Sequence, residues 1–230
     1  MELPLQLSLF TALDLTAVGL LFFFWLLIGW RIERDSPKTP SVSRIMADYR
    51  RKWMQQMLTR QPRIFDAQIM STLRQGTSFF ASTSMIALGA TLALVGNADS
   101  LVGVAEDLTV TSYPPFVWEI KLLLVAVFLT NAFLKFVWSN RLFGYCSVLM
   151  AAVPNDPEDP DAEKMARRAA EVNITAARSF NRGLRAVYFA LASLTWLGGP
   201  YLLIAGALIT LVVIWRREFA SESRRILLEK

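Results

Sequence analysis

The stretch from Leu7 to Trp30 limits most strongly what this chain can fold into. Its 24 residues contain one charged side chain, Asp14. A helix of that length reaches roughly 36 Å, which is enough to cross a bilayer core of about 30 Å. Comparable apolar runs recur at Phe79–Val95, Val117–Trp138 and Val187–Trp215. We therefore expect an all-α fold, a polytopic transmembrane helical bundle.

The chain length and the apolar runs together predict one membrane domain over residues 1–230. The chain is 54% hydrophobic, and its length leaves no room for a second globular domain. We predict spans at about 7–30, 72–96, 116–138, 183–197 and 200–216. Gly198-Gly199-Pro200 separates the last two. We interpret them as a hairpin or as one long helix kinked at Pro200, since proline removes a helical hydrogen bond.

The basic residues predict the orientation of the chain. Residues 31–74 carry ten Lys or Arg against four acids, whereas residues 96–115 carry no Lys or Arg and three acids, Asp99, Glu106 and Asp107. The positive-inside rule then places the N-terminus outside and the first connection inside. A hairpin at Pro200 would bring the basic C-terminal tail inside too. We expect a multi-pass protein of the cell inner (cytoplasmic) membrane.

Two connections carry amphipathic patterns, at about 42–60 and 160–181, and we predict an interfacial helix in each. The first helix places basic residues between apolar ones, so it either docks on lipid or a partner or simply lies on the surface and joins two spans. Five cations are candidate contacts to anionic lipid: Arg44, Arg50, Arg51, Lys52 and Arg74. Arg74 has a second possible partner in Asp66.

Polar groups inside the apolar runs are the first candidates for function, because burying them is costly unless they are paired or wetted. Asp14 and Lys121 fall at similar depth and predict an intramembrane ion pair. Asn131 and Lys135 lie deeper along the same run as Lys121. The pair is either a structural clamp between helices or one end of a polar path through all four residues.

The second apolar run is rich in small and hydroxylated residues between Gly76 and Ala90. Small residues allow membrane helices to approach closely, and hydroxyl groups bond to neighbouring backbone. A polar translocation face is the sharper interpretation of this pattern. Helix packing is the commoner one.

The residue types present give no catalytic set. The chain has no histidine and one cysteine, Cys146, which lies in an apolar run. That removes the usual ligands of haem, zinc and copper, and it makes a haem or quinone redox subunit a weak interpretation. Neither GxGxxG nor a Walker pattern occurs. We expect no cofactor, no metal site and no enzyme activity.

An ordered set of stretches carries a resemblance to a known family. These stretches are ALDLTAVGLLFFFW, YRRKW, DAQIMSTLRQGTSFFASTSM, KLLLVAVFLTNAFLKFVWSNRLFGYCSVLMAAVP and SFNRGLRAVYFALASLTWLGGPYLLIAGALI. In their order and spacing, from about residue 10 to 215, the chain resembles the domain of unknown function 599, a family of small membrane proteins in bacteria and plants. The resemblance implies an all-helical integral membrane protein and transfers no activity, ligand or catalytic residue.

These observations favour a non-catalytic integral membrane protein that assembles with itself or serves as an accessory subunit of a membrane complex. A transporter or channel for a small molecule or ion is the alternative, and an enzyme acting on lipid at the inner leaflet is the second. The expected partners are membrane lipids and either other integral membrane proteins or a second copy of the chain. The net charge of +5 does not indicate nucleic acid, because the basic residues lie next to membrane segments.

Overall fold

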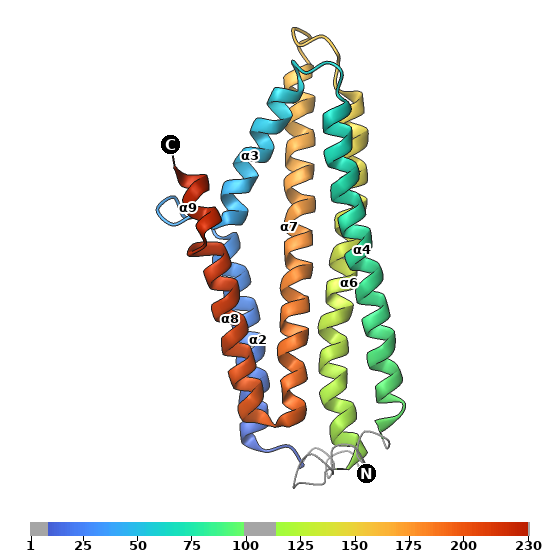
Figure 1. Ribbon diagram of the computed structural model, residues 1–230, viewed down its shortest axis with the longest axis vertical. Coiled ribbons are helices and arrows are strands. Elements are labelled where there is room, and N and C mark those ends of the chain that lie inside the picture. The colour runs from blue at the N-terminus through green and yellow to red at the C-terminus, as the bar shows by residue number, and fades with distance from the viewer. Residues whose placement is uncertain (1–8, 99–113, 230) are drawn as a thin grey trace. The chain divides into compact units, whose positions relative to one another are not determined.

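The computed structural model describes residues 9–98 and 114–229, and it is all-α over that part of the chain. The first two residues of the predicted span 7–30 and the acids Asp99, Glu106 and Asp107 lie outside the described residues. Figure 1 labels the elements, which are α2 (Ala12–Glu33), α3 (Val42–Met57), α4 (Ile64–Val95), α6 (Pro115–Ala152), α7 (Ala162–Leu194), the 3-10 helix η1 (Thr195–Gly198), α8 (Pro200–Phe219) and α9 (Glu222–Leu228).

Three helices in the described residues are long and apolar enough to cross a membrane by length and composition, namely α2, α4 and α6. They contain most of the described parts of the predicted spans 7–30, 72–96 and 116–138. The predicted spans 183–197 and 200–216 are not among the three. Helix α6 has 38 residues, roughly 57 Å, so it is much longer than a bilayer core requires.

Helix α7 differs from the prediction. The sequence predicts an interfacial helix at 160–181 and a separate span from 183, whereas the structure has one helix of 33 residues. Gly183 is the residue at which a break would be expected. A Cβ added there would lie 2.7 Å from the Phe136 ring, so this glycine permits close packing and does not end the helix.

A tight turn joins α7 to α8, where the sequence left a hairpin or a kinked helix open. Helix α7 passes into η1, and Gly199 then takes φ 110°, a conformation that favours glycine. Pro200 begins α8, where its missing N–H removes no helical bond. The Thr195 hydroxyl donates to the Leu202 carbonyl (2.9 Å). The two helices run back along each other from this turn (Figure 1).

The described chain divides into two compact units. Unit 1 comprises Met1–Trp30, Thr83–Ala132 and Arg185–Trp215, and unit 2 comprises Arg31–Ser82, Phe133–Leu184 and Arg216–Lys230. Large aromatic rings fill the interior of unit 1. Phe128 of α6 lies 5.4 Å from both Phe22 and Trp25 of α2 and 6.2 Å from Phe189 of α7, measured between ring centroids.

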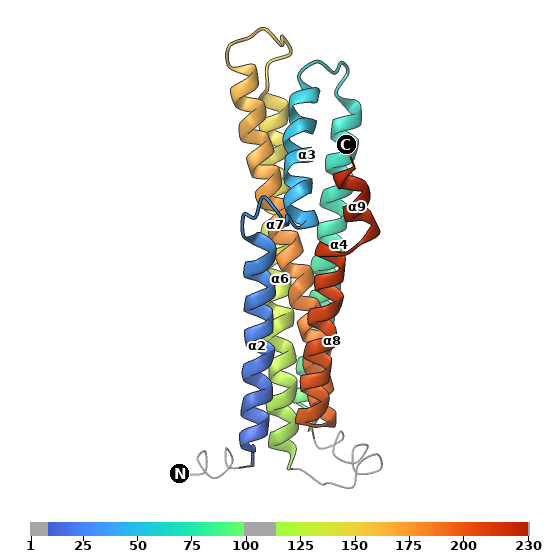
Figure 2. The same ribbon diagram turned by 90° about the vertical axis from the view of Figure 1, so that its left-hand side faces the viewer.

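Methionine and alanine side chains fill much of the interior of unit 2, together with Cys146. Helix α3 begins at the N-cap Ser41, whose hydroxyl accepts a hydrogen bond from the Arg44 amide, and it lies beside α7 (Figure 2). Its residues Met54 and Met57 are fully buried in this core. Part of the apolar face of the helix predicted at 42–60 therefore packs against the protein, where α7 and α4 supply apolar partners, whereas Met46 and Tyr49 stay exposed.

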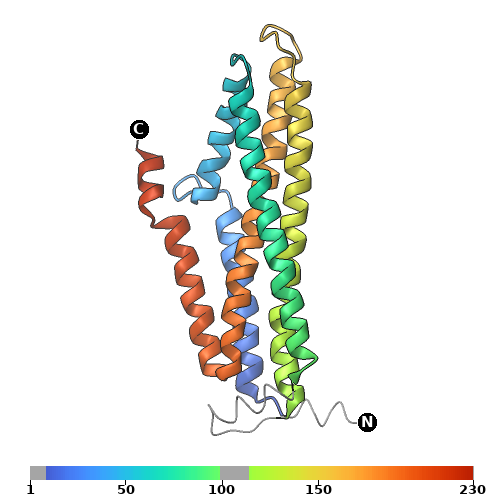
Figure 3. The ribbon, with the colours of Figure 1, turned by 45° about the vertical axis from the view of Figure 1, so that its right-hand side comes forward.

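Helices α4 and α6 lie side by side in unit 2 (Figure 3), where the Asn140 amide donates to the Ser78 hydroxyl (2.6 Å). After Asp66, the buried positions of α4 recur every seven residues, at Met70, Thr77, Ser84 and Thr91. A period of seven keeps one narrow stripe of a helix against its neighbours. Most of the remaining surface of α4 is left open, since only 11% of its most apolar window is buried.

Candidate functional site

Asp14 lies near the start of α2 and is 8% exposed. Its carboxylate accepts hydrogen bonds from the Thr11 amide (3.0 Å), the Thr11 hydroxyl (2.6 Å) and the Trp196 indole N–H (2.8 Å). The Thr11 hydroxyl accepts in turn from the Asp14 amide (3.2 Å). These contacts satisfy a buried charge by hydrogen bonds from Thr11, just before α2, and from Trp196 of η1.

Lys121 of α6 is 4% exposed, and its Nζ lies 5.3 Å from the Trp118 ring and 6.0 Å from the Trp196 ring. Trp196 therefore touches both members of the predicted pair, with its N–H on Asp14 and its ring face toward Lys121. The charges of Asp14 and Lys121 also act on each other. The structure thus joins α2, α6 and η1 around one indole, where the sequence predicts an ion pair alone.

The other two members of the predicted polar path lie further along α6. Asn131 is half-buried and follows Lys121 by ten residues, roughly 15 Å along the helix axis. The backbone carbonyl of Lys135 accepts a hydrogen bond from the Ser179 hydroxyl (3.0 Å). The described contacts do not join either residue to the Asp14–Trp196–Lys121 group, and the polar path stays a prediction.

The predicted lipid-contacting cations of α3 have protein partners. Arg44 forms an ion pair with Asp35 (2.7 Å), and Arg51 forms ion pairs with Asp48 and Glu171 (both 2.7 Å). The hydrogen bond to Glu171 raises the pKa of Arg51. These pairs are part-exposed, so each contributes little to stability on its own.

Arg50 and Lys52 differ in their surroundings. The Arg50 guanidinium donates to the side-chain oxygen of Asn173, which is fully buried, and burial lowers the pKa of Arg50. Lys52 is exposed, and its Nζ lies 5.2 Å from the Tyr49 ring centroid. Arg50 thus faces the interior of unit 2, because Asn173 offers a polar partner there, whereas Lys52 stays at the surface.

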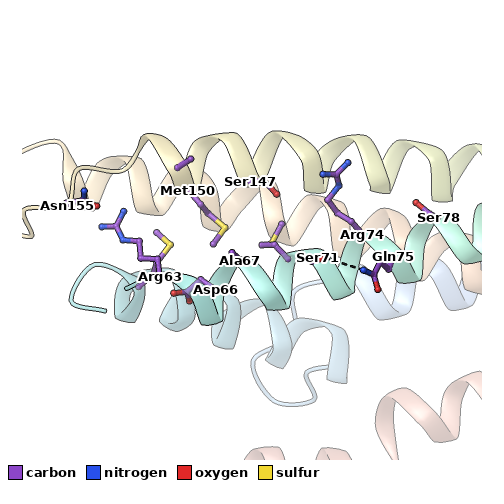
Figure 4. Close-up of a pocket in the computed structure, with 13 residues that line it drawn as sticks. Arg63, Asp66, Ala67, Ser71, Arg74, Gln75, Ser78, Ser147, Met150 and Asn155 are labelled. Atoms are coloured by element: carbon purple, nitrogen blue, oxygen red, sulfur yellow. Dashed lines mark hydrogen bonds between the residues drawn. The ribbon is translucent and has the colours of Figure 1, made fainter. Parts of the chain in front are cut away.

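Arg74, the fifth predicted cation, lines a cavity of about 820 Å³ between α4 and α6. Figure 4 shows the cavity as a strip along the two helices, with Arg63 and Asn155 at one end and Ser78 at the other. Methionine and alanine side chains form its apolar walls, from Met57, Ala67, Met70, Met150 and Ala151. An amphipathic lining of this kind is typical of a ligand site.

Asp66 is the most buried charge of this cavity, with its side chain 1% exposed. Its Oδ1 accepts hydrogen bonds from the Trp53 indole N–H (2.7 Å) and from the Arg60 guanidinium. Its Oδ2 has no partner among the described residues. A buried carboxylate oxygen without a donor is costly, and it marks the place where a ligand group would be stabilised.

Arg74 does not bind Asp66, although the sequence left that contact open. Its Nε donates to the Asn140 side chain at 3.4 Å, a long hydrogen bond. Arg63 closes the opposite end of the cavity by donating to the carbonyls of Val153 and Pro154 (both 2.8 Å). Arg60 reaches Asp66 from the short segment that joins α3 to α4, six residues earlier in the chain.

A second hollow, of about 630 Å³, adjoins this cavity at Arg74 and Ser78. It continues along the same two helices toward Ala81 and Val137, and it also contains Arg141. We call the two together the α4–α6 groove. It holds three arginines and one carboxylate, so its charge is positive before a ligand binds.

Sequence reasoning found Arg74 but missed Asp66 and Arg63 as parts of a site. One signal was present, since Asp66 follows Arg60 and Arg63 and precedes the apolar part of the same helix. The partners of Asp66 come from the chain turning back at Pro62, which no periodicity in the sequence reveals. Among the described residues, no three or more Cys, Asp or Glu side chains are grouped to hold a metal ion.

The fold and the hydropathy of α2, α4 and α6 define an all-α membrane protein. Over residues 16–223 the chain matches the model of a family described as protein of unknown function, DUF599, which confirms the resemblance in the ordered stretches. The chain belongs to this family. No curated protein and no solved structure matches it.

Proposed function

We propose that this is a non-catalytic protein of the cell inner membrane, with its N-terminus outside, that assembles with itself or with other membrane proteins. The observation that carries the proposal is the open face of α4. Only 11% of the most apolar window of α4 is buried, against 44% for α6, although their mean hydropathies are similar (1.7 and 2.0).

Part of that face is suited to a second helix. Met85, Gly89, Leu92 and Ala93, which we call the α4 stripe, are all exposed and lie on one side of the helix. A Cβ added to Gly89 would meet nothing within 4 Å, so packing within the chain does not require this glycine. Glycine and alanine four residues apart allow two membrane helices to approach closely, which supports docking of another helix here.

The two alternative functions have less support. The transporter reading needs a polar path, and Asp14 and Lys121 already share Trp196 as a contact. The lipid-acting enzyme reading uses the cations of α3, three of which have acidic or amide partners in the protein. We therefore consider both alternatives less well supported than assembly with a partner.

The test is native-mass analysis of the full chain extracted from its own membrane in mild detergent. We expect a complex of fixed stoichiometry, containing either more than one copy or a second membrane protein. Gly89→Leu should break it, because a branched side chain keeps the two helices apart. Gly19→Leu on α2 is the matched control, since Gly19 is also exposed with nothing within 4 Å. A wild-type chain that runs alone contradicts the proposal.

A further inference from the structure

We infer that the α4–α6 groove binds a glycerophospholipid whose headgroup carries a hydrogen-bond donor beyond the phosphate. The first support is Asp66. Its side chain is 1% exposed, it lines the larger cavity, and its Oδ2 lacks a donor among the described residues. An ammonium or hydroxyl group of a ligand supplies that donor, and the negative charge of Asp66 favours it.

The second support is the positive charge in the middle of the groove. Arg74 lies where the two hollows adjoin, and Arg141 lines the second hollow. Arg74 lines both hollows, and the hydrogen bond described for its guanidinium is the long one to Asn140 (3.4 Å), which leaves further N–H donors for a ligand. Arginine binds phosphate oxygens through two parallel N–H groups, so a phosphodiester fits beside Arg74.

The third support is the order in which acidic, basic and apolar side chains follow one another along α4. Asp66, Arg74 and Ala81 follow one another at intervals of roughly 12 Å and 10 Å along the helix. At this end the second hollow is lined by the apolar residues Ala81 of α4 and Val137 of α6. A ligand that matches this order has a donor group, then a phosphate, then an apolar chain, which is the order of groups in a phospholipid.

This inference goes beyond assembly and uses different residues. None of the four residues of the α4 stripe lines either hollow. A failure of lipid binding therefore leaves the assembly proposal intact, and a chain that runs alone leaves the lipid site intact.

The test measures binding to the full chain in detergent micelles, from the rise in thermal unfolding midpoint as lipid is added. Phosphatidylethanolamine and phosphatidylcholine with identical acyl chains are the matched pair, because they share the phosphodiester and the net charge but only the first has N–H donors. We expect the first to bind about tenfold more tightly. Glycerol 3-phosphate, which has no acyl chain, should fail to compete.

Two variants separate the two ends of the headgroup. Arg74→Gln should lower the affinity for both lipids about tenfold, because it removes the contact to the phosphate that they share. Asp66→Asn should remove the preference between them. Arg178→Gln, at an exposed arginine of α7 outside both hollows, is the control and should change nothing.

Asp66→Asn also touches Trp53 and Arg60 and can unfold unit 2, so Arg74→Gln decides the matter if that variant does not fold. Equal binding of the two lipids to the wild type overturns the inference, as does unchanged binding to Arg74→Gln. Competition by glycerol 3-phosphate as tight as the lipid itself replaces the phospholipid with a soluble phosphate ester and overturns it too.

Discussion

Helices α4 and α6 are similar in length and hydropathy, but they have opposite roles in packing. The most apolar window of α6 is 44% buried, whereas that of α4 is 11% buried. In unit 1 the Phe128 ring of α6 contacts α2 and α7, and in unit 2 the Ser139 hydroxyl and Cys146 thiol of α6 donate to carbonyls of α7. Helix α4 buries one residue in seven.

The difference teaches that hydropathy identifies a membrane helix without telling which surface the protein uses. In lipid, an apolar side chain gains little from leaving the bilayer for the protein interior, so shape and polar contacts decide packing. The bulky rings and polar contacts of α6 bring other helices to it. The α4 stripe is exposed and contains Gly89 and Ala93, which supports docking of a partner helix on it.

The largest effect should come from removing the ring at the centre of unit 1. Phe128 is 1% exposed, so Phe128→Ala leaves a cavity and should lower the free energy of unfolding by about 3–5 kcal/mol. Phe79 of α4 is 66% exposed, and Phe79→Ala should cost much less. Denaturant unfolding in mixed micelles measures both. Equal losses would mean that α4 is as central as α6.

A smaller effect should come from the charged pair that meets at Trp196. Asp14→Asn and Lys121→Met should each lower the free energy of unfolding by about 1–3 kcal/mol, because each leaves the other charge buried without its partner. The double variant should lose less than the sum, and less than either single change. Losses that simply add would show that α2 and α6 are not coupled through these side chains.

Adding one methyl group at each of two glycines should give effects of opposite sign, and the gain is the smallest effect expected. Gly183→Ala directs a Cβ to within 2.7 Å of the Phe136 ring of α6, so it should destabilise unit 2 by about 1–3 kcal/mol. Gly76→Ala on α4 meets nothing within 4 Å and should stabilise by up to about 1 kcal/mol through helix propensity. Thermal unfolding of both variants gives the signs. A lower stability of Gly76→Ala would mean that another group packs against Gly76.

Much of the fold could be predicted from the sequence. The apolar runs predict α2, α4 and α6, because a bilayer fixes both length and polarity. The single helix α7 could not be predicted, since glycine disfavours a helix by propensity and the close approach of Gly183 to the Phe136 ring depends on tertiary packing. The turn at Gly199 was one of two alternatives, and the φ of 110° that distinguishes it from a kink is a feature of the folded backbone.

The candidate site was less predictable than the fold. The sequence predicts the pairing of Asp14 and Lys121 from their similar depth in the membrane. The position of Trp196 between them depends on the turn at Gly199. Asp66 becomes a site residue because Trp53 and Arg60 occupy one oxygen and leave the other unpaired. Such pairing depends on tertiary packing, which one sequence does not contain.

The most direct test of the open face of α4 is cysteine cross-linking in native membranes. In a Cys146→Ala background, single cysteines replace each residue of the α4 stripe, and Ala90 and Leu94, exposed on another side of α4, serve as controls. We predict strong cross-links from the stripe and weak ones from the controls. Equal yields at all positions, or none at any, would contradict a second copy of the chain docked on this face.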